Sequence, residues 1–151
     1  MTHLKIGDQA PNFKGIVQDG REIKLEDYKG NKLIVFFYPR DNTPTCTTTA
    51  CNLRDNYEDL VKAGYKVIGV STDTEKKHQN FIKKYNFQYD LIADVDKEVH
   101  SAFGVWGPKK FMGREFDGTI RTTFVIDEKG VIENVISKVK AGTHTEQILS
   151  N

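Results

Sequence analysis

Two stretches of the chain are apolar at nearly every position, without alternating polar residues. They are residues 33–38 and 66–71. Runs of β-branched and aromatic residues of this length are typical of strands that are covered on both faces of a sheet. A shorter apolar run at residues 91–93 predicts a third strand. The chain therefore predicts a sheet with a buried centre.

Residues 46–61 show the periodicity of an amphipathic helix. Apolar residues recur there at three- and four-residue steps and form one stripe toward the sheet: Ala50, Leu53, Tyr57, Leu60 and Val61. Residues 74–85 predict a second, Lys-rich helix, and residues 96–103 and 145–149 predict short helices. Helices thus alternate with the buried strands.

Two pairs of short strands have the pattern of hairpins. Residues 13–18 and 22–25 flank an Asp-Gly dipeptide that favours a tight turn, and residues 122–127 and 131–136 flank a Glu-Lys-Gly turn. Residues 25–30 predict one short helical turn. The glycine-rich segment 104–118 predicts a long loop with room for a minor strand.

The order of these elements predicts an α/β protein with a mixed central sheet, helices on both faces and an N-terminal β-hairpin. With 151 residues the chain has the size of one domain, and residues 1–151 show no linker, repeat or low-complexity tract. In an open α/β sheet, reactive groups gather at the carboxyl ends of the parallel strands. Cys46 follows such an end.

Charge and cysteine content narrow the class of protein. The 22 basic and 21 acidic residues nearly cancel and form no single-sign block, so neither nucleic acid nor an anionic membrane is expected as a partner. Residues 1–8 lack the apolar core of a signal peptide, and no run reaches the length of a membrane span. We therefore expect a cytoplasmic protein, whose two cysteines are reactive groups rather than a structural disulfide.

The segment after the first buried strand places Cys46 at the start of a helix. Pro39 cannot donate a hydrogen bond to a sheet, so the strand ends there. Thr43 is a good N-cap and Pro44 suits the first helical position, which makes Cys46 the third helical residue. The N–H groups of that turn lack helical partners, and the helix dipole favours an anion there. The thiol is therefore biased toward thiolate, the nucleophilic form.

Cys51 lies five residues further along the same helix, on the solvent side in line with Asp55 and Asp59. Helix geometry places the Cα atoms of Cys46 and Cys51 roughly 8–9 Å apart. A disulfide needs roughly 4.4–6.8 Å between Cα atoms. Either both cysteines stay as thiols or the first turns of the helix unwind.

The segment around Cys46 resembles a known active-site pattern. Pro39, Thr43 and Cys46 have the spacing of the peroxiredoxin signature, and residues 37–48 with 50–55 resemble the bacterioferritin comigratory protein branch of that family. Further segments of the chain resemble the same branch: residues 7–13, 67–71, 106–107, 110–113 and 121–127. The resemblance implies a thioredoxin-like fold and thiol-dependent reduction of hydrogen peroxide and organic hydroperoxides, with no cofactor or metal.

Two residues depart from the pattern of this branch. Thr45 stands where glycine is usual, which alters how closely the backbone can approach a peroxide. Thr49 stands where glutamate is usual, which removes a carboxylate close to the site. Rate and thiolate stability are therefore not carried over from the family.

The resemblance also implies a role for each site residue. Cys46 attacks the distal peroxide oxygen as thiolate and becomes a sulfenic acid. Arg121 supplies a permanent positive charge that holds the thiolate and stabilises the leaving oxygen. The Thr43 hydroxyl orients the peroxide or caps the helix, and Pro39 shields the site from water. Cys51 condenses with the sulfenic acid, and a thioredoxin-like dithiol reduces the disulfide. Because both cysteines lie in one helix, we expect a monomer.

Alternatives remain for several of these assignments. Arg121 has the alternative of a solvated surface position. A zinc site built from the two cysteines and two histidines fits poorly, because no paired ligands follow them. A disulfide oxidoreductase normally carries Cys-x2-Cys, which the four-residue gap between Cys46 and Cys51 disfavours. A redox-sensing interaction protein, switched by the same pair, is the alternative function.

Overall fold

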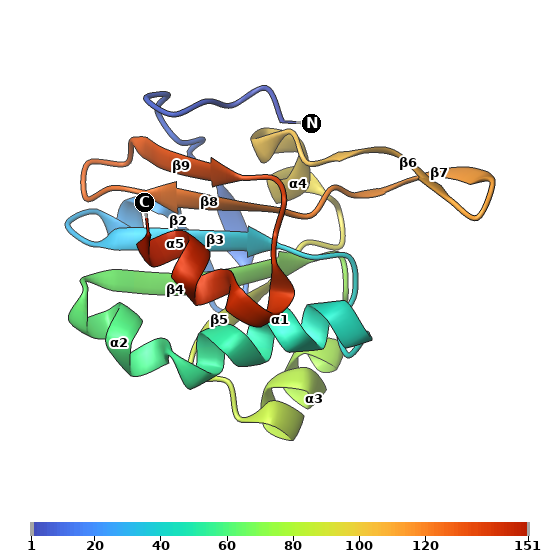
Figure 1. Ribbon diagram of the computed structural model, residues 1–151, viewed down its shortest axis with the longest axis horizontal. Coiled ribbons are helices and arrows are strands. Elements are labelled where there is room, and N and C mark those ends of the chain that lie inside the picture. Colours follow the sequence, from blue (N-terminus) through green and yellow to red (C-terminus); the bar gives the residue numbers. More distant parts are fainter. Residues whose placement is uncertain (1, 151) are drawn as a thin grey trace.

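A five-stranded mixed sheet forms the centre of the molecule (Figure 1). The computed structural model describes residues 2–150, apart from the side chain of Phe111. The strand order is β5-β4-β3-β8-β9. The three parallel strands are β3 (Lys32–Phe37), β4 (Tyr65–Ser71) and β5 (Asp90–Ala93), while β8 (Thr122–Ile126) and β9 (Ile132–Ile136) each run antiparallel to the strand before them in this order. The predicted mixed sheet with a buried centre is confirmed.

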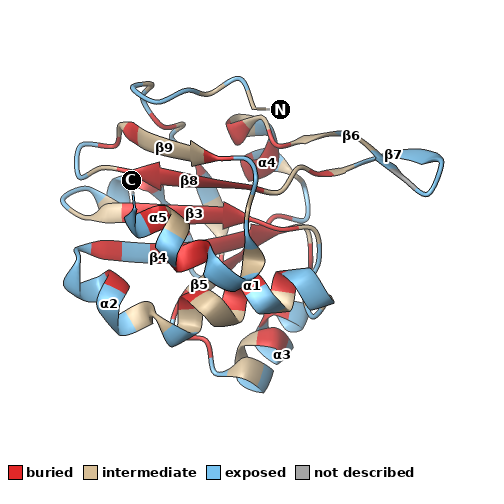
Figure 2. Ribbon diagram, viewed as in Figure 1, coloured by how far each residue is buried: buried red, intermediate tan, exposed pale blue. Residues whose placement is uncertain are grey.

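Figure 2 shows that the central strands β3, β4 and β8 are buried along most of their length. An apolar cluster covers each face of the sheet. One cluster packs against α1 (Pro44–Asp55), α2 (Tyr57–Lys62), α3 (Glu75–Tyr85) and α5 (His144–Leu149). The other packs against α4 (Glu98–Phe103) and the N-terminal hairpin of β1 (Lys14–Ile16) and β2 (Glu22–Lys24). Two 3-10 turns complete the fold, η1 (Leu25–Tyr28) and η2 (Ala141–Thr143). Helices on both faces and the N-terminal hairpin are thus confirmed.

The helix predicted over residues 46–61 is broken at Asn56. This residue adopts φ −108° and ψ 13°, and its side-chain amide donates to the Asn52 carbonyl at 2.8 Å. Side-chain bonds of this kind compete with the regular helical bonds of the backbone. The break turns α2 away from the expected stripe, so Leu60 is buried but Val61 is 44% exposed. The prediction of one continuous apolar stripe is therefore wrong at its end.

The segment predicted as a long loop is a second hairpin. β6 (Trp106–Phe111) and β7 (Arg114–Thr119) pair antiparallel through Met112 and Gly113, which both have positive φ values of 52° and 78°. Two successive residues in this conformation give the tight turn that matches the twist of a hairpin. The glycine and proline within β6 hid the strand, because both residue types are depleted in strands. The hairpin projects from the body of the molecule (Figure 1).

Within residues 2–150, no helix is long and apolar enough to cross a membrane. Within the same range, no three His, Cys, Asp or Glu side chains gather in a group that could hold a metal ion.

Candidate active site

Cys46 is buried in the first turn of α1. Thr43 occupies the N-cap and Pro44 the first helical position, so Cys46 is the third helical residue, as predicted. The residue is 1% exposed and packs into the cluster that covers one face of the sheet. The first helical bond runs from the Thr47 N–H to the Thr43 carbonyl at 2.8 Å. The thiol therefore lies at the positive end of the helix dipole.

Strand pairing brings Arg121 to this thiol. Thr122 pairs with Phe37, so the residue before β8 lies where β3 ends and the loop to α1 begins. Arg121 Nη2 donates a hydrogen bond to Cys46 Sγ at 3.3 Å. Arg121 Nη1 is buried and has no hydrogen-bond partner among the described residues. The guanidinium thus binds the sulfur with one terminal nitrogen and keeps the other without a partner among the described residues.

Thr43 and Pro39 lie on the loop that leads to Cys46. The Thr43 hydroxyl does not cap the helix but donates to the Arg40 carbonyl at 3.1 Å. Thr43 therefore occupies the predicted N-cap position, but its oxygen accepts no hydrogen bond from the first turn of the helix. The hydroxyl oxygen keeps its lone pairs for an incoming donor. Pro39 is half-buried directly after Tyr38, whose N–H still donates to the Val70 carbonyl at 3.1 Å.

Cys51 is half-buried in the second turn of α1 and packs against the same apolar cluster as Cys46. Its predicted position on the solvent side is therefore only partly correct. Both cysteines are free thiols, and α1 is intact across them. Burial raises the pKa of the Cys51 thiol; the Arg54 charge opposes this shift and Asp55 reinforces it. The folded helix thus disfavours the thiolate form of Cys51.

The two residues that depart from the family pattern hydrogen-bond within α1. The Thr49 hydroxyl is buried and donates to the Thr45 carbonyl at 3.0 Å. The Thr48 hydroxyl makes the equivalent bond to the Pro44 carbonyl at 3.0 Å. Where a carboxylate was expected from the resemblance, the site therefore has a neutral hydroxyl that is already bound to the backbone.

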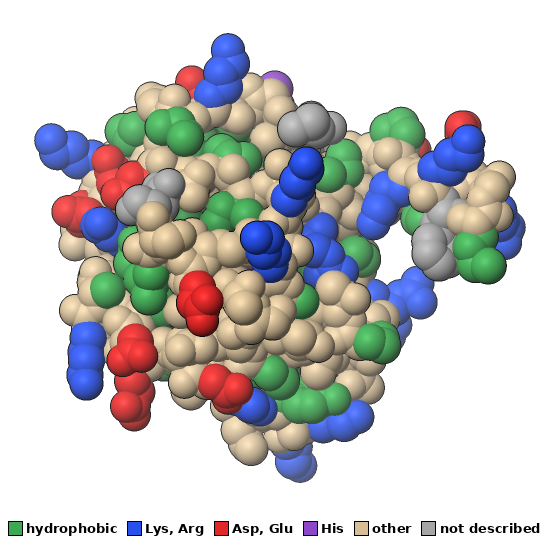
Figure 3. All heavy atoms as spheres, viewed as in Figure 1, with side chains coloured by type: hydrophobic (Ala, Val, Ile, Leu, Met, Phe, Trp, Pro, Cys, Tyr) green, Lys and Arg blue, Asp and Glu red, His purple; other side chains and the backbone are tan. Residues whose placement is uncertain are grey.

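Lys109 on β6 is a second cation near the sulfur, which the sequence did not reveal. It is half-buried, and its Cδ passes 3.2 Å from where a Cβ at Gly118 would lie. Burial and the Arg121 charge lower the pKa of Lys109, whereas the Cys46 thiolate acts in the opposite direction. Figure 3 shows Lys and Arg side chains around the gap between the projecting hairpin and the body. No local pattern marks Lys109, because its position depends on how the hairpin folds.

His144 on α5 lies near Arg121 and was also missed. It is fully buried; its Nδ1 lies 2.9 Å from Gln147 Oε1 and its Nε2 lies 2.8 Å from the Thr123 hydroxyl. An amide oxygen only accepts, so Nδ1 carries the proton and Nε2 accepts from Thr123. Burial lowers the pKa of His144; the bond to Gln147 opposes the shift and the Arg121 charge adds to it. A neutral imidazole thus borders the site.

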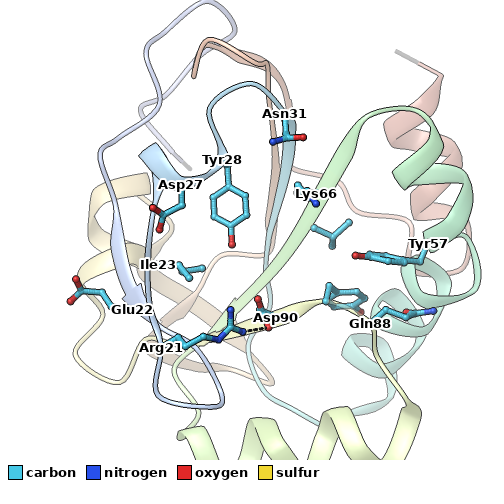
Figure 4. Close-up of a pocket in the computed structure, with 12 residues that line it drawn as sticks. Arg21, Glu22, Ile23, Asp27, Tyr28, Asn31, Tyr57, Lys66, Gln88 and Asp90 are labelled. Atoms are coloured by element: carbon cyan, nitrogen blue, oxygen red, sulfur yellow. Dashed lines mark hydrogen bonds and ion pairs between the residues drawn. The ribbon is translucent and has the colours of Figure 1, made fainter.

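A cavity of about 620 Å³ lies elsewhere, between the N-terminal hairpin and the start of β4 and β5 (Figure 4). The Arg21–Asp90 ion pair, 2.9 Å long, crosses it. Burial, with the charges of Asp90 and Asp27, raises the pKa of Tyr28 in its wall to about 12. None of the predicted site residues lines this cavity. The chemistry of the side chains, rather than the size of a cavity, therefore identifies the site.

Comparison with known proteins gives a consistent family. The model of the AhpC/TSA family matches residues 6–135. Peroxiredoxin Bcp of Escherichia coli K12 is 44% identical over 150 residues, which cover 99% of this chain and 96% of that protein. Peroxiredoxin Bcp of Bacillus subtilis is 39% identical over 146 residues, 97% of this chain and 93% of that protein.

Solved structures of the same group have this fold. PrxQ of Xylella fastidiosa superposes with a TM-score of 0.92 at 29% identity, covering 99% of this chain and 96% of that chain. The bacterioferritin comigratory protein of Xanthomonas campestris superposes with a TM-score of 0.87 at 30% identity, covering 99% and 96%. The thioredoxin-like fold is thereby confirmed. The chain belongs to the AhpC/TSA family and, within it, to the Bcp peroxiredoxins.

Proposed function

We propose that this protein is a thiol peroxidase that reduces hydrogen peroxide and organic hydroperoxides with Cys46. The thiolate sulfur attacks the distal peroxide oxygen, the O–O bond breaks, and its electron pair leaves with the other oxygen. Cys46 becomes a sulfenic acid, and the leaving oxygen takes a proton to become water or an alcohol. The single observation that carries this proposal is the Arg121 contact to the buried sulfur at 3.3 Å.

Arg121 serves both the attacking sulfur and the leaving oxygen. Nη2 stabilises the sulfur anion, and Nη1, which has no partner among the described residues, can donate to the oxygen that gains charge. Thr43 presents acceptor lone pairs toward the proton of the peroxide. Pro39 limits the access of water at the end of β3. The bacterioferritin comigratory protein of Xanthomonas campestris is described as having alkyl peroxide reduction activity, which supports organic hydroperoxides as substrates here.

Cys51 resolves the sulfenic acid in the second half of the cycle. The first turns of α1 open, the Cys51 sulfur attacks the Cys46 sulfur, and the sulfenic oxygen leaves as water. An external dithiol of the thioredoxin class then reduces the disulfide to two thiols and is itself oxidised. We further propose that residues 1–151 form one domain that acts in the cytoplasm. We propose that it acts as a monomer, because both cysteines of the cycle lie in one helix.

A coupled assay with a thioredoxin system tests this function across hydrogen peroxide and several organic hydroperoxides. Multiple turnovers are expected for the parent protein. Cys46→Ser is expected to abolish peroxide consumption, whereas Cys51→Ser is expected to consume one equivalent and then stall. Equal loss of the first oxidation in both variants would contradict the assignment. One oxidation of the parent without turnover would instead support the redox-sensing alternative.

A further inference from the structure

The loop between β3 and α1 is tied to the body of the protein through Asp41. The Asp41 side chain is 5% exposed. Its Oδ1 accepts from the Tyr38 hydroxyl at 2.6 Å, and its Oδ2 lies 2.6 Å from His78 Nδ1 on α3. Its backbone N–H donates to Asp73 Oδ2 at 2.6 Å. This residue thus connects the loop that leads to Cys46 with β3, with α3 and with the end of β4.

His78 completes the connection to β5. The ring is fully buried, and its Nε2 lies 2.9 Å from the Ile92 carbonyl. A carbonyl only accepts, so Nε2 must carry a hydrogen. The contact between Nδ1 and Asp41 therefore requires one further proton, on either the ring or the carboxyl group. The His78–Asp41 pair is net neutral in both arrangements and is held together by that proton.

None of the described neighbours can replace this proton. Tyr38 is a neutral donor, because burial and Asp41 raise the pKa of its hydroxyl well above the usual value. Asp73 is an acceptor that is occupied by Ser71 at 2.9 Å, and Lys77 lies 3.9 Å from its other oxygen. A cavity of about 260 Å³, with Arg40, Lys77 and Lys84 among its lining residues, gives solvent access to Asp41. Loss of the proton would leave a carboxylate facing an imidazole lone pair at 2.6 Å.

The clamped residue lies within the loop that builds the site. Asp41 is two residues after Pro39 and two before Thr43. The next residue, Asn42, has a positive φ of 62°, and its side-chain oxygen accepts from the Tyr85 hydroxyl at 3.0 Å. Asp41 and Asn42 together fix the path by which the chain enters α1 and presents Cys46.

We propose that His78 and Asp41 are positioning residues for the peroxidase reaction, which hold the loop before Cys46 in its reactive geometry. The proposal rests on the proposed function of Cys46. Neither residue contacts the sulfur, so the effect is on the placement of Cys46, Thr43 and Pro39. Misplacement of reacting groups by about 1 Å can cost on the order of a hundredfold in rate.

Two substitutions test whether the hydrogen bonds of Asp41 hold the loop. Asp41→Ala removes the bonds to His78 and Tyr38, and the rate constant for oxidation of Cys46 by hydrogen peroxide is expected to fall at least about tenfold. Asp41→Asn can donate to Nδ1 of a neutral His78 and still accept from Tyr38. It keeps the hydrogen bonds that hold the loop, so its rate constant near neutral pH is expected within about threefold of the parent.

The second buried His–Asp pair of the protein provides a matched control. His100 and Asp94 have the same 2.6 Å contact and the same exposures of 0% and 5%, but they lie outside the loop. Asp94→Ala is expected to lower the melting temperature at least as much as Asp41→Ala and to change the rate constant less. Equal rate losses in the two alanine variants would show general destabilisation and overturn the proposal.

Rescue by the conservative variant is the decisive readout. Single-turnover rate constants for oxidation of Cys46 by hydrogen peroxide are measured for the parent, Asp41→Asn, Asp41→Ala and Asp94→Ala. Asp41→Asn is expected to react nearly as fast as the parent even if its melting temperature is lower. A rate constant for Asp41→Asn as low as that of Asp41→Ala overturns the proposal. If the parent does not react with peroxide at all, the proposed function fails instead, which distinguishes the two failures.

Discussion

Arg121 gives the sharpest test of how the site works. Arg121→Ala removes the donor that lies 3.3 Å from Cys46 Sγ and also Nη1, which has no partner among the described residues. A hydrogen bond to a charged group contributes about 1.5–3 kcal/mol, and each 1.36 kcal/mol corresponds to a factor of ten in rate. The loss of the sulfur contact alone therefore predicts a decrease of about ten- to a hundredfold. Because Nη1 can also serve the leaving oxygen, the total is expected at or above the upper end of that range.

Arg121→Lys distinguishes charge from geometry. A lysine keeps one positive charge but has no planar fork, so it cannot serve the sulfur and an oxygen with two fixed nitrogens. We expect its rate constant between those of the parent and Arg121→Ala. The fraction of Cys46 present as thiolate, followed by its ultraviolet absorbance, is expected to be lower in Arg121→Ala than in Arg121→Lys.

The assay is stopped-flow oxidation of the reduced protein by hydrogen peroxide, with Cys51→Ser as the background so that only the first step is observed. Arg21→Ala is the matched control, because Arg21 forms ion pairs with Asp19 and Asp90 and lines the cavity that contains none of the site residues. It is expected to leave the rate constant unchanged. A rate constant for Arg121→Ala within threefold of the parent would falsify the assigned role of Arg121.

Three further outcomes are expected. Oxidation to the Cys46–Cys51 disulfide should raise amide hydrogen exchange over residues 45–53 and leave residues 57–61 protected. The Thr-rich sequence favours opening of the first turns, and buried Leu60 keeps the later turns docked. An oxidised monomer whose first helical turn is intact would contradict this prediction. Lys109→Met should slow Cys46 oxidation less than Arg121→Ala does, since Lys109 adds charge near the sulfur without a direct bond to it. An equal decrease of the rate constant in the two variants would mean that Lys109 contacts the reacting atoms. Because the pKa of His144 is lowered on folding, the unfolded chain binds a proton more readily than the folded one. The contribution of neutral His144 to the free energy of unfolding is therefore present above the unfolded pKa of 6.5 and is lost as pH falls below that value. Urea unfolding should show that the free energy of unfolding declines more steeply over that range in the parent than in His144→Asn, which removes this titration.

Local pattern predicted most of the elements, because helix and strand periodicities depend on neighbours in sequence. The apolar run that became β3 and the Thr43–Pro44 start of α1 are of this kind, and both were found where they were expected. The errors occur where a side chain or a turn overrides the local pattern. Asn56 breaks the long helix through a bond to Asn52, and Met112 adopts a left-handed conformation that its residue type does not predict.

Residues close together in the chain were sufficient to establish the fold class, the position of Cys46 in the first turn of a helix, and its separation from Cys51 while that helix is intact. Each of these features depends on residues within a few positions of one another. Which charges meet the sulfur depends instead on the folded arrangement. Arg121 is 75 residues from Cys46 in sequence and reaches it because β8 pairs with β3.

The same distinction applies to the loop before Cys46. The sequence contains Asp41 and His78, 37 residues apart, but no local signal connects them. The parallel strands bring their carboxyl ends to one edge of the sheet, and the loop and helix that follow these strands therefore meet there. Such contacts between distant residues depend on the register of a whole sheet, which no local pattern encodes.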